Sequence, residues 1–319
     1  MYSYSMIQWL FIFYFYCFCG WCFESTYVSL KSRKLVNRGF MRGPFLPLYG
    51  SGAVMMLLVS KPFQEHILLV YVAGCVGATV LEYVTGVTME ALFKVRYWDY
   101  SKNKFNFQGH ICLGSSLAWG FLTILMTEYV HKPVERLVLF IPANWLTVAA
   151  VILTAYICAD FALSFKAAMD LRDILVKMEK AKEELIHIQK RLDVIIALTS
   201  EDFANRKEAL TENFIQRKEK WSQSIGMHME DVKNGIEDKL DGLKELALTK
   251  PSEYMESIKG EITELKEKYI RSMADREYLS GLRDFFQRDL IRSNPTMSSV
   301  RFKEALEELQ RRANERRKK

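Results

Sequence analysis

Acidic residues inside apolar segments are the side chains of this sequence best placed to do chemistry. A carboxylate is costly to bury in a bilayer, so such residues mostly face a polar interior and bind ions, substrates or basic groups. Four of them fall toward one end of the predicted spans: Glu24, Glu82, Glu90 and Asp160. Glu128 lies near the opposite end. This pattern indicates either a substrate or ion site or ion pairs that fix loops to helix ends. Glu82 lies deepest, which favours a functional role for it.

Residues of two loops would complete such a site. Arg38 and Arg42 lie in a strongly basic loop, while Asp99 and His110 lie in the aromatic-rich segment 95–114. Opposite charges nearby lower the cost of burying a carboxylate. We therefore predict a polar pocket whose candidate substrate- or ion-binding residues are Glu82, Glu90, Glu24, Asp160, Arg38, Arg42, Asp99 and His110.

Glu82 and Glu90 also form a pattern of their own. They are eight residues apart, which is ~80° around a helix, and Gly86 lies between them. The spacing predicts that one helix face offers both carboxylates to a cation or a basic group.

No motif of the sequence predicts catalysis, a cofactor or a metal. The chain lacks the phosphate-loop, G-x-S-x-G and H-E-x-x-H patterns, so we expect no enzyme. Cys19 and Cys22 form a C-x-x-C, but no second pair or histidine completes a ligand set, and small buried residues are favoured over a thiol pair. An intramembrane enzyme that uses Glu82, Asp99 or His110 on a lipid is least favoured, because no nucleophile can be paired with a base.

The elements that must position these residues are apolar helices. Five stretches approach or exceed the ~20 residues that a bilayer requires, namely about 6–28, 44–60, 66–93, 111–130 and 137–165. The second is the shortest and contains Pro44 and Pro47, so a broken or re-entrant helix is the alternative to a full crossing. We count it as a span, because only five spans agree with the loop charges.

The loop charges predict the orientation of the chain. Loops 31–43 and 94–110 are basic, and basic loops stay inside, whereas loops 61–65 and 131–136 are short and nearly neutral. We expect the N-terminus outside, the C-terminus inside and the first span to be retained as an anchor.

Composition divides the chain near residue 165. Residues 1–165 contain 12 Lys and Arg and 8 Asp and Glu, whereas residues 166–319 contain 32 and 30. We predict an all-α protein with a transmembrane permease-like domain (1–165) and a cytoplasmic coiled-coil or helical-hairpin domain with a basic tail (166–319). No Gly or Pro occurs from Ala143 to Thr199, which predicts one helix that continues from the last span into the cytoplasm.

A heptad pattern follows the last span. Leucine-type residues and isoleucines alternate at seam positions over residues 171–195, which is typical of a coiled coil and favours a homo-oligomer of more than two strands. A helix hairpin within one chain would bury the same stripe. Further helices are expected at about 199–249, 252–291 and from Ser299 onward.

The C-terminal tail RRANERRKK would attract anionic lipid or nucleic acid, but a solvated terminus is favoured. No basic face interleaved with stacking aromatics occurs, so nucleic-acid binding is not favoured.

Three motifs suggest a family. NRGFMRGPFLPLYGSG (37–52), LEYVTG (81–86) and the segment from VRYWDYS to HICLGSSLAWG (95–120) together resemble the bacterial ABC-transporter type IV permeases, over roughly residues 5–135. The resemblance implies a multi-pass permease-like domain in a bacterial plasma membrane, with a separate ATPase subunit as a partner. The loops lack the coupling helix by which ordinary ABC permeases dock that subunit, because Glu90-Ala91-Leu92 has no following Gly and later Pro. The matching positions are Asn37, Arg38, Gly39, Arg42, Gly43, Pro44, Pro47, Gly50, Glu82, Trp98, Asp99, Tyr100 and His110.

These observations leave two leading hypotheses. In the first, the membrane half binds or moves a solute or ion at the inner-side pocket. In the second, the spans anchor a coiled-coil assembly or signalling protein that has no transport activity.

Overall fold

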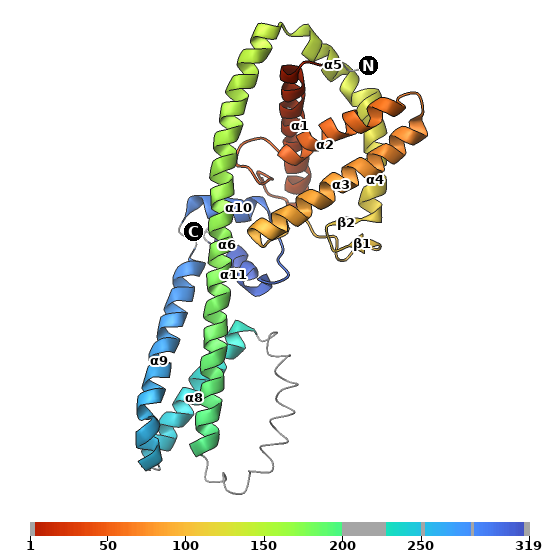
Figure 1. Ribbon diagram of the computed structural model, residues 1–319. Helices are drawn as coiled ribbons and strands as arrows, with labels where there is room; N and C mark the ends of the chain where they lie inside the picture. Colours follow the sequence, from red (N-terminus) through yellow and green to blue (C-terminus); the bar gives the residue numbers. More distant parts are fainter. Residues whose placement is uncertain (1–3, 200–227, 250–252, 282–283, 316–319) are drawn as a thin grey trace. The chain divides into compact units, whose positions relative to one another are not determined.

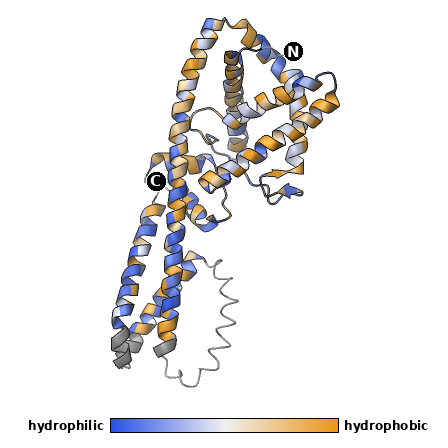
Figure 2. Cartoon of the chain, viewed as in Figure 1, coloured by the Kyte–Doolittle hydropathy of each residue, from blue (hydrophilic) through white to orange (hydrophobic). Residues whose placement is uncertain are grey.

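A computed structural model describes residues 4–199, 228–249, 253–281 and 284–315 (Figure 1). Within these residues the protein is all-α, as predicted, apart from one small antiparallel hairpin of β1 (Asn106–Phe107) and β2 (Ile111–Cys112). Hydrophobic residues dominate the helices of the first half, and polar residues dominate those of the second (Figure 2).

The chain folds into two compact units. The first comprises Met1–Asp173 and Leu282–Lys319, and the second comprises Ile174–Gly281. This grouping differs from the division at residue 165 that composition suggests. The reason is that the last segment of the chain, although polar, makes its contacts with the loops of the membrane half.

Most helices of the chain belong to the first unit. They are α1 (Met6–Ser32), α2 (Pro47–Ser60), the 3-10 turn η1 (Lys61–Phe63), α3 (Ile67–Phe93), α4 (Leu113–Leu125), the π-helical turn η2 (Met126–Val130), α5 (His131–Phe140), the first part of α6 (Ala143–Thr199), α10 (Phe285–Ser293) and α11 (Lys303–Glu315). A capping box at Ser5 and Gln8 begins α1, and Arg33 in the left-handed region ends it.

Within the described residues, three helices are long and apolar enough to cross a membrane: α1, α3 and residues Ala143–Ile196 of α6. Their large apolar side chains are extensively exposed, as for Val76 and Val151, which suits contact with lipid. Helix α2 has 14 residues and a length of about 21 Å, which is shorter than a bilayer core of about 30 Å. Its start at Pro47 agrees with the alternative of a broken helix, and five crossings stay a prediction.

The prediction of a loop at residues 131–136 is wrong. Residues 113–140 are helical throughout, and the break before α6 falls at Ile141 and Pro142 instead. The π-helical turn η2 lies just before Pro133, which cannot donate a backbone hydrogen bond. A proline near the start of α5 is tolerated there, so the helix continues through a sequence that resembles a loop.

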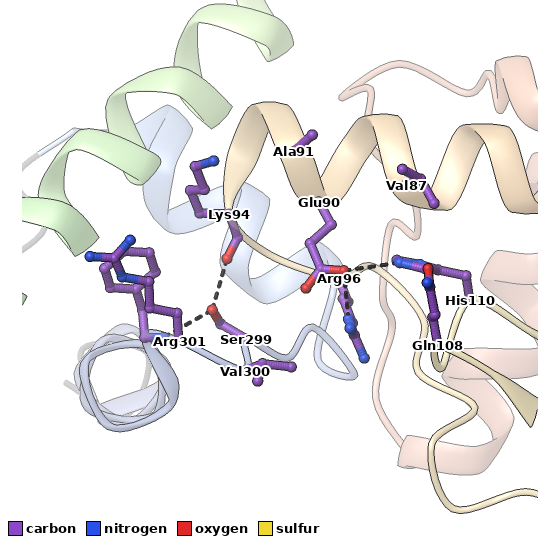
Figure 3. A pocket seen from close by; sticks show the side chains of 11 residues that line it. Val87, Glu90, Ala91, Lys94, Arg96, Gln108, His110, Ser299, Val300 and Arg301 are labelled. Atoms are coloured by element: carbon purple, nitrogen blue, oxygen red, sulfur yellow. Dashed lines mark hydrogen bonds and ion pairs between the residues drawn. The ribbon is translucent and has the colours of Figure 1, made fainter. Parts of the chain in front are cut away.

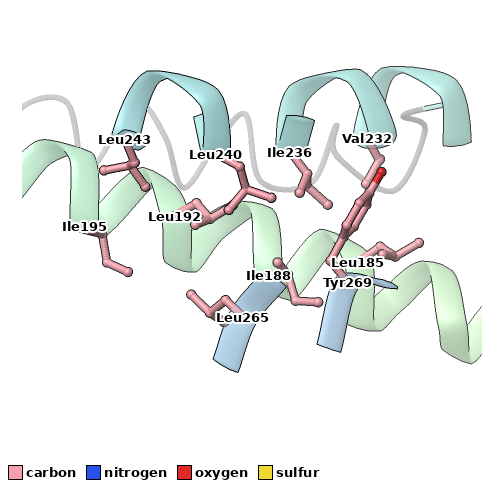
Figure 4. Close-up of a cluster of buried hydrophobic side chains, with 10 residues drawn as sticks. All are labelled: Leu185, Ile188, Leu192, Ile195, Val232, Ile236, Leu240, Leu243, Leu265 and Tyr269. Carbon is pink, nitrogen blue, oxygen red and sulfur yellow. The ribbon is translucent and has the colours of Figure 1, made fainter. Parts of the chain in front are cut away.

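Helix α6 confirms the prediction of one unbroken helix, because it extends over the 57 residues Ala143–Thr199. Its later part forms the second unit together with α8 (Met229–Thr249) and α9 (Glu253–Ser280). The seam residues of α6 lie in one apolar cluster with residues of both other helices (Figure 4). That cluster consists of Leu185, Ile188, Leu192, Ile195, Val232, Ile236, Leu240, Leu243, Leu265 and Tyr269. The chain thus buries residues 185–195 of the stripe against its own helices, which is the hairpin alternative. A homo-oligomer through residues 171–195 stays a prediction.

The C-terminal helices differ from the prediction in their bounds. The helix expected at 252–291 is two helices, because α9 ends before Gly281 and a new helix, α10, begins after Asp284. The Asp284 carboxylate accepts a hydrogen bond from the Phe286 amide and caps this start. The helix expected from Ser299 begins at Lys303. Residues 200–227 of the helix expected at about 199–249 lie outside the described residues, and α8 forms its later part.

Truncating the seam should destabilise the second unit. Leu192 is fully buried, so Leu192→Ala should cost about 3 kcal/mol and speed amide hydrogen exchange in α8 and α9. Val194, on the exposed side of the same helix, provides the matched control, and Val194→Ala should leave exchange nearly unchanged. Equal increases in amide exchange for Leu192→Ala and Val194→Ala would contradict this packing.

Candidate functional site

The basic loop after α1 places one arginine inside the first unit. Arg38 is only 9% exposed, and its Nε lies 3.5 Å from Glu24 Oε1. The other oxygen of Glu24 accepts a hydrogen bond of 2.7 Å from the Tyr49 hydroxyl on α2. The guanidinium also donates to the Tyr97 carbonyl oxygen at 3.2 Å. Two predicted site residues, Glu24 and Arg38, are therefore brought together as an ion pair.

Glu82 has a different environment. Its side chain, on α3, is buried and accepts hydrogen bonds from the Tyr100 hydroxyl (3.0 Å), the Trp119 indole (3.0 Å) and the Ser115 hydroxyl (3.4 Å). All three donors are neutral, and within the described residues no lysine, arginine or histidine forms an ion pair with Glu82. The carboxylate is thus held in place by dipoles, which stabilise a negative charge but do not cancel it.

A cavity of about 720 Å³ brings these groups together. Glu24, Arg38 and Glu82 line it, with Tyr49 and Tyr100 beside them. The remaining lining residues are mostly apolar or aromatic and come from α1, α2, the loop after α3, α4, η2 and α5: Phe15, Tyr16, Cys19, Gly20, Phe23, Leu48, Gly52, Ala53, Met56, Trp98, Trp119, Leu122, Met126, Val130 and Val134. A mostly apolar cavity with a few convergent polar groups is the usual form of a small-molecule site.

Glu90 does not line this cavity. Its carboxylate is 2.8 Å from Arg96 Nε and 3.0 Å from His110 Nε2, and these three residues line a second cavity of about 640 Å³ (Figure 3). A Cβ atom on Gly86 would lie 2.9 Å from the His110 ring and 3.3 Å from the Trp98 ring. Because these rings pack against the glycine between them, Glu82 and Glu90 have separate partners, and the expectation that one helix face offers both to a single ligand is not met.

Asp99 belongs to the second cluster. It accepts hydrogen bonds from the backbone and hydroxyl of Ser101 and lies 3.7 Å from Arg96 Nη1. Burial alone would raise the pKa of Asp99, but the hydrogen bonds from Ser101 and Ser298 and the charge of Arg96 lower it below its ordinary value. Asp99 is therefore a fixed anion of the loop.

Asp160 and Arg42 lie outside both cavities. Asp160, on α6, accepts a hydrogen bond of 2.8 Å from the Gly43 amide and so fixes the basic loop to that helix. Arg42 forms an ion pair of 3.4 Å with Asp289 and lies over the Phe286 ring at 4.1 Å. These two residues correspond to the second interpretation of the acidic pattern, in which ion pairs and hydrogen bonds hold loops to helices.

The segment after α10 binds the same loops. Asn294 accepts a hydrogen bond of 2.8 Å from Arg38 Nη1 and donates one of 2.8 Å to the Gly39 carbonyl oxygen. Thr296 accepts from Arg38 Nη2 at 3.2 Å. Ser298 pairs with Arg96 through two backbone hydrogen bonds of 2.7 and 3.0 Å. We call residues 294–302 the C-terminal strap.

Sequence reasoning missed the neutral partners of the site. Tyr100 lies in a motif of the resemblance, but nothing in the sequence pairs it, Ser115 or Trp119 with Glu82. Asn294 is 256 residues from the arginine that it binds, and no local pattern connects the two.

The membrane-length apolar helices and the all-α fold define the class of this chain as a membrane protein. Residues 11–165 match the sequence model of the family described as "Putative ABC-transporter type IV", which confirms the resemblance for this part of the chain. The matched residues include all those that line the cavity of about 720 Å³ and exclude the C-terminal strap. Comparison with curated proteins and with solved structures gives no match.

Removing the amide of Asn294 should release the strap. Asn294 is 1% exposed, so Asn294→Ala deletes a buried acceptor of Arg38 and should cost about 2 kcal/mol, because hydrogen bonds to charged groups contribute about that much. Amide exchange in residues 285–302 should increase. Asn314→Ala, on the exposed side of α11, is the control and should change nothing. Unaltered exchange in the Asn294 variant would show that this residue does not hold the strap.

The Glu90 cluster should loosen in acid. Burial lowers the pKa of His110, and Arg96 acts in the same direction, while Glu90 and Asp99 oppose the shift. Because the folded-state pKa lies below the unfolded value of about 6.5, neutral His110 stabilises the fold fully above that pH, and this stabilisation is lost as the pH falls through the folded pKa. The protection factors of amides in residues 95–112, taken relative to the intrinsic exchange rate at each pH, should therefore fall below about pH 6.5.

The His110→Gln variant should lose this part of the pH dependence, whereas His187→Gln, at an exposed position of α6, should retain it. An identical pH profile for wild type and His110→Gln would refute the assignment.

Proposed function

We propose that the membrane half of this chain binds and moves a solute across a bacterial plasma membrane, with Glu82 as the group that binds its charged part. The single observation that carries the proposal is the cavity of about 720 Å³ with a buried carboxylate that has no basic partner among the described residues. Glu24 and Arg38, in the same cavity, neutralise each other. The cavity therefore has an excess of one negative charge.

This charge suggests the class of solute. A cation entering the cavity would replace lost hydration with attraction to Glu82, while the aromatic rings of Trp98, Tyr100 and Trp119 would stabilise a positive charge through their faces. The apolar lining from α1, α2 and α4 would contact a hydrophobic body. An organic cation with an apolar portion fits both features, and a small inorganic cation fits only the first.

The proposed orientation follows from the loop charges. Five crossings, with the N-terminus outside, would place Glu82 and the two basic loops toward the cytoplasm, along with the second unit. The family suggests a separate ATPase subunit as the energy source, because the chain has no nucleotide-binding motif of its own. The coupling helix that would dock such a subunit is absent from the loops, so its contact would lie elsewhere.

The assembly hypothesis has less support. It rests on the apolar stripe of residues 171–195, and the structure buries Leu185, Ile188 and Leu192 against α8 and α9 of the same chain. These covered residues offer no apolar face to a second copy, while a homo-oligomer through the rest of residues 171–195 stays a prediction.

Removing the charge of Glu82 tests the proposal. In proteoliposomes, Glu82→Gln should bind tetraphenylphosphonium at least tenfold more weakly and lose its flux, because the amide has no charge and presents an NH₂ group to three donors. Glu128→Gln removes a half-exposed carboxylate of η2 that lies outside the cavity and should behave as wild type. Both variants should be checked for membrane insertion and melting temperature.

Filling the cavity tests the same site without changing its charge. A Cβ atom on Gly52 meets no atom within 4 Å, and Gly52 lines the cavity. Gly52→Phe should therefore fold, occupy the cavity and reduce tetraphenylphosphonium binding, whereas Gly52→Ala should preserve it. Normal flux in a well-folded Glu82→Gln protein and in Gly52→Phe would exclude transport through this cavity.

A further inference from the structure

The strap forms one wall of the second cavity. It pairs with Arg96 through the backbone of Ser298, and the Ser299 hydroxyl donates a hydrogen bond of 2.8 Å to the Lys94 carbonyl oxygen. Lys94 follows directly after α3 and takes a left-handed conformation (φ 61°) that ends the helix. The strap thus lies against the end of a membrane-length helix, where lipid headgroups are found.

The charges around this cavity divide into two groups. Glu90 is satisfied by Arg96 and His110, and these three lie at one end (Figure 3). Lys94 and Arg301 lie at the other end, and in the part of the chain that the structure describes neither forms an ion pair with a carboxylate. Among the described residues, their two positive charges therefore have no carboxylate to balance them.

The wall beside these charges is apolar and exposed. Val87 and Ala91 lie on the accessible side of α3, and Val300 of the strap is 71% exposed. At the end of a membrane span, apolar side chains contact the acyl chains of lipids. Lysine and arginine side chains at the same depth extend to the lipid phosphates. The two cations suit the phosphate of an anionic phospholipid, and the apolar wall suits its acyl chains.

We propose that the cavity at the end of α3 binds an anionic phospholipid. Lys94 and Arg301 bind its phosphate, and Val87, Ala91 and Val300 contact the upper part of its acyl chains. A volume of about 640 Å³ is within the range of small-molecule sites, so it holds a headgroup with its glycerol. Because Val300 and Arg301 come from the strap, the site is complete only while the strap is bound to the loops at Arg38 and Arg96.

The experiment uses the full-length protein in nanodiscs and native mass spectrometry. Wild type should retain phosphatidylglycerol over phosphatidylcholine, and Lys94→Gln/Arg301→Gln should bind it roughly thirtyfold more weakly, because each basic residue near an anionic surface contributes about a factor of five. Lys102→Gln/Arg311→Gln removes the same charge from exposed positions outside the cavity and should retain wild-type binding. Val300→Asn should weaken lipid binding while leaving any binding of glycerophosphoglycerol unchanged.

Each other result overturns the proposal. Equal losses in the two double variants would indicate general attraction between a basic protein and anionic lipid. Binding of glycerophosphoglycerol or inorganic phosphate as tight as that of phosphatidylglycerol would indicate a soluble phosphate ligand. No preference of wild type for phosphatidylglycerol would mean that the cavity does not select an anionic lipid.

Discussion

The buried guanidinium of Arg38 is the constraint on which the first unit depends. A charge removed from water must be paired and hydrogen-bonded, or it costs several kcal/mol. Here the partners come from separate parts of the chain: Glu24 on α1, the Tyr97 carbonyl after α3, and Asn294 and Thr296 of the strap. Satisfying one side chain therefore fixes the position of the basic loop, the aromatic loop and the C-terminal strap together.

The sequence predicts best where the physical signal is local. The absence of Gly and Pro after Pro142 predicted α6 from Ala143 to Thr199. The presence of carboxylates inside apolar segments identified Glu24 and Glu82 as cavity residues. This pattern could not show that Glu82 and Glu90 line different cavities. That separation depends on the packing of the His110 and Trp98 rings against Gly86. Loop 131–136 was mispredicted since its polar residues occupy a helix.

Neutral and distant partners account for most of what sequence reasoning missed. A tryptophan in an apolar segment is common, so the indole that binds Glu82 carries no signal by itself. The strap is polar and follows a charged helical region, so composition assigns it to the second half of the chain. Its backbone pairing with Arg96 depends on a return of the chain to the membrane half that no periodicity encodes.

The separation between Arg38 and Asn294 also imposes an order on biosynthesis. The two residues are 256 positions apart, and a ribosome adds roughly 5–20 residues per second, so the arginine is made tens of seconds before its partner. During this interval Arg38 of the nascent chain can pair with Glu24 but lacks its two acceptors in the strap, Asn294 and Thr296. A chain that terminates before residue 294 would keep the ion pair with Glu24 but leave part of the guanidinium without its hydrogen-bond acceptors.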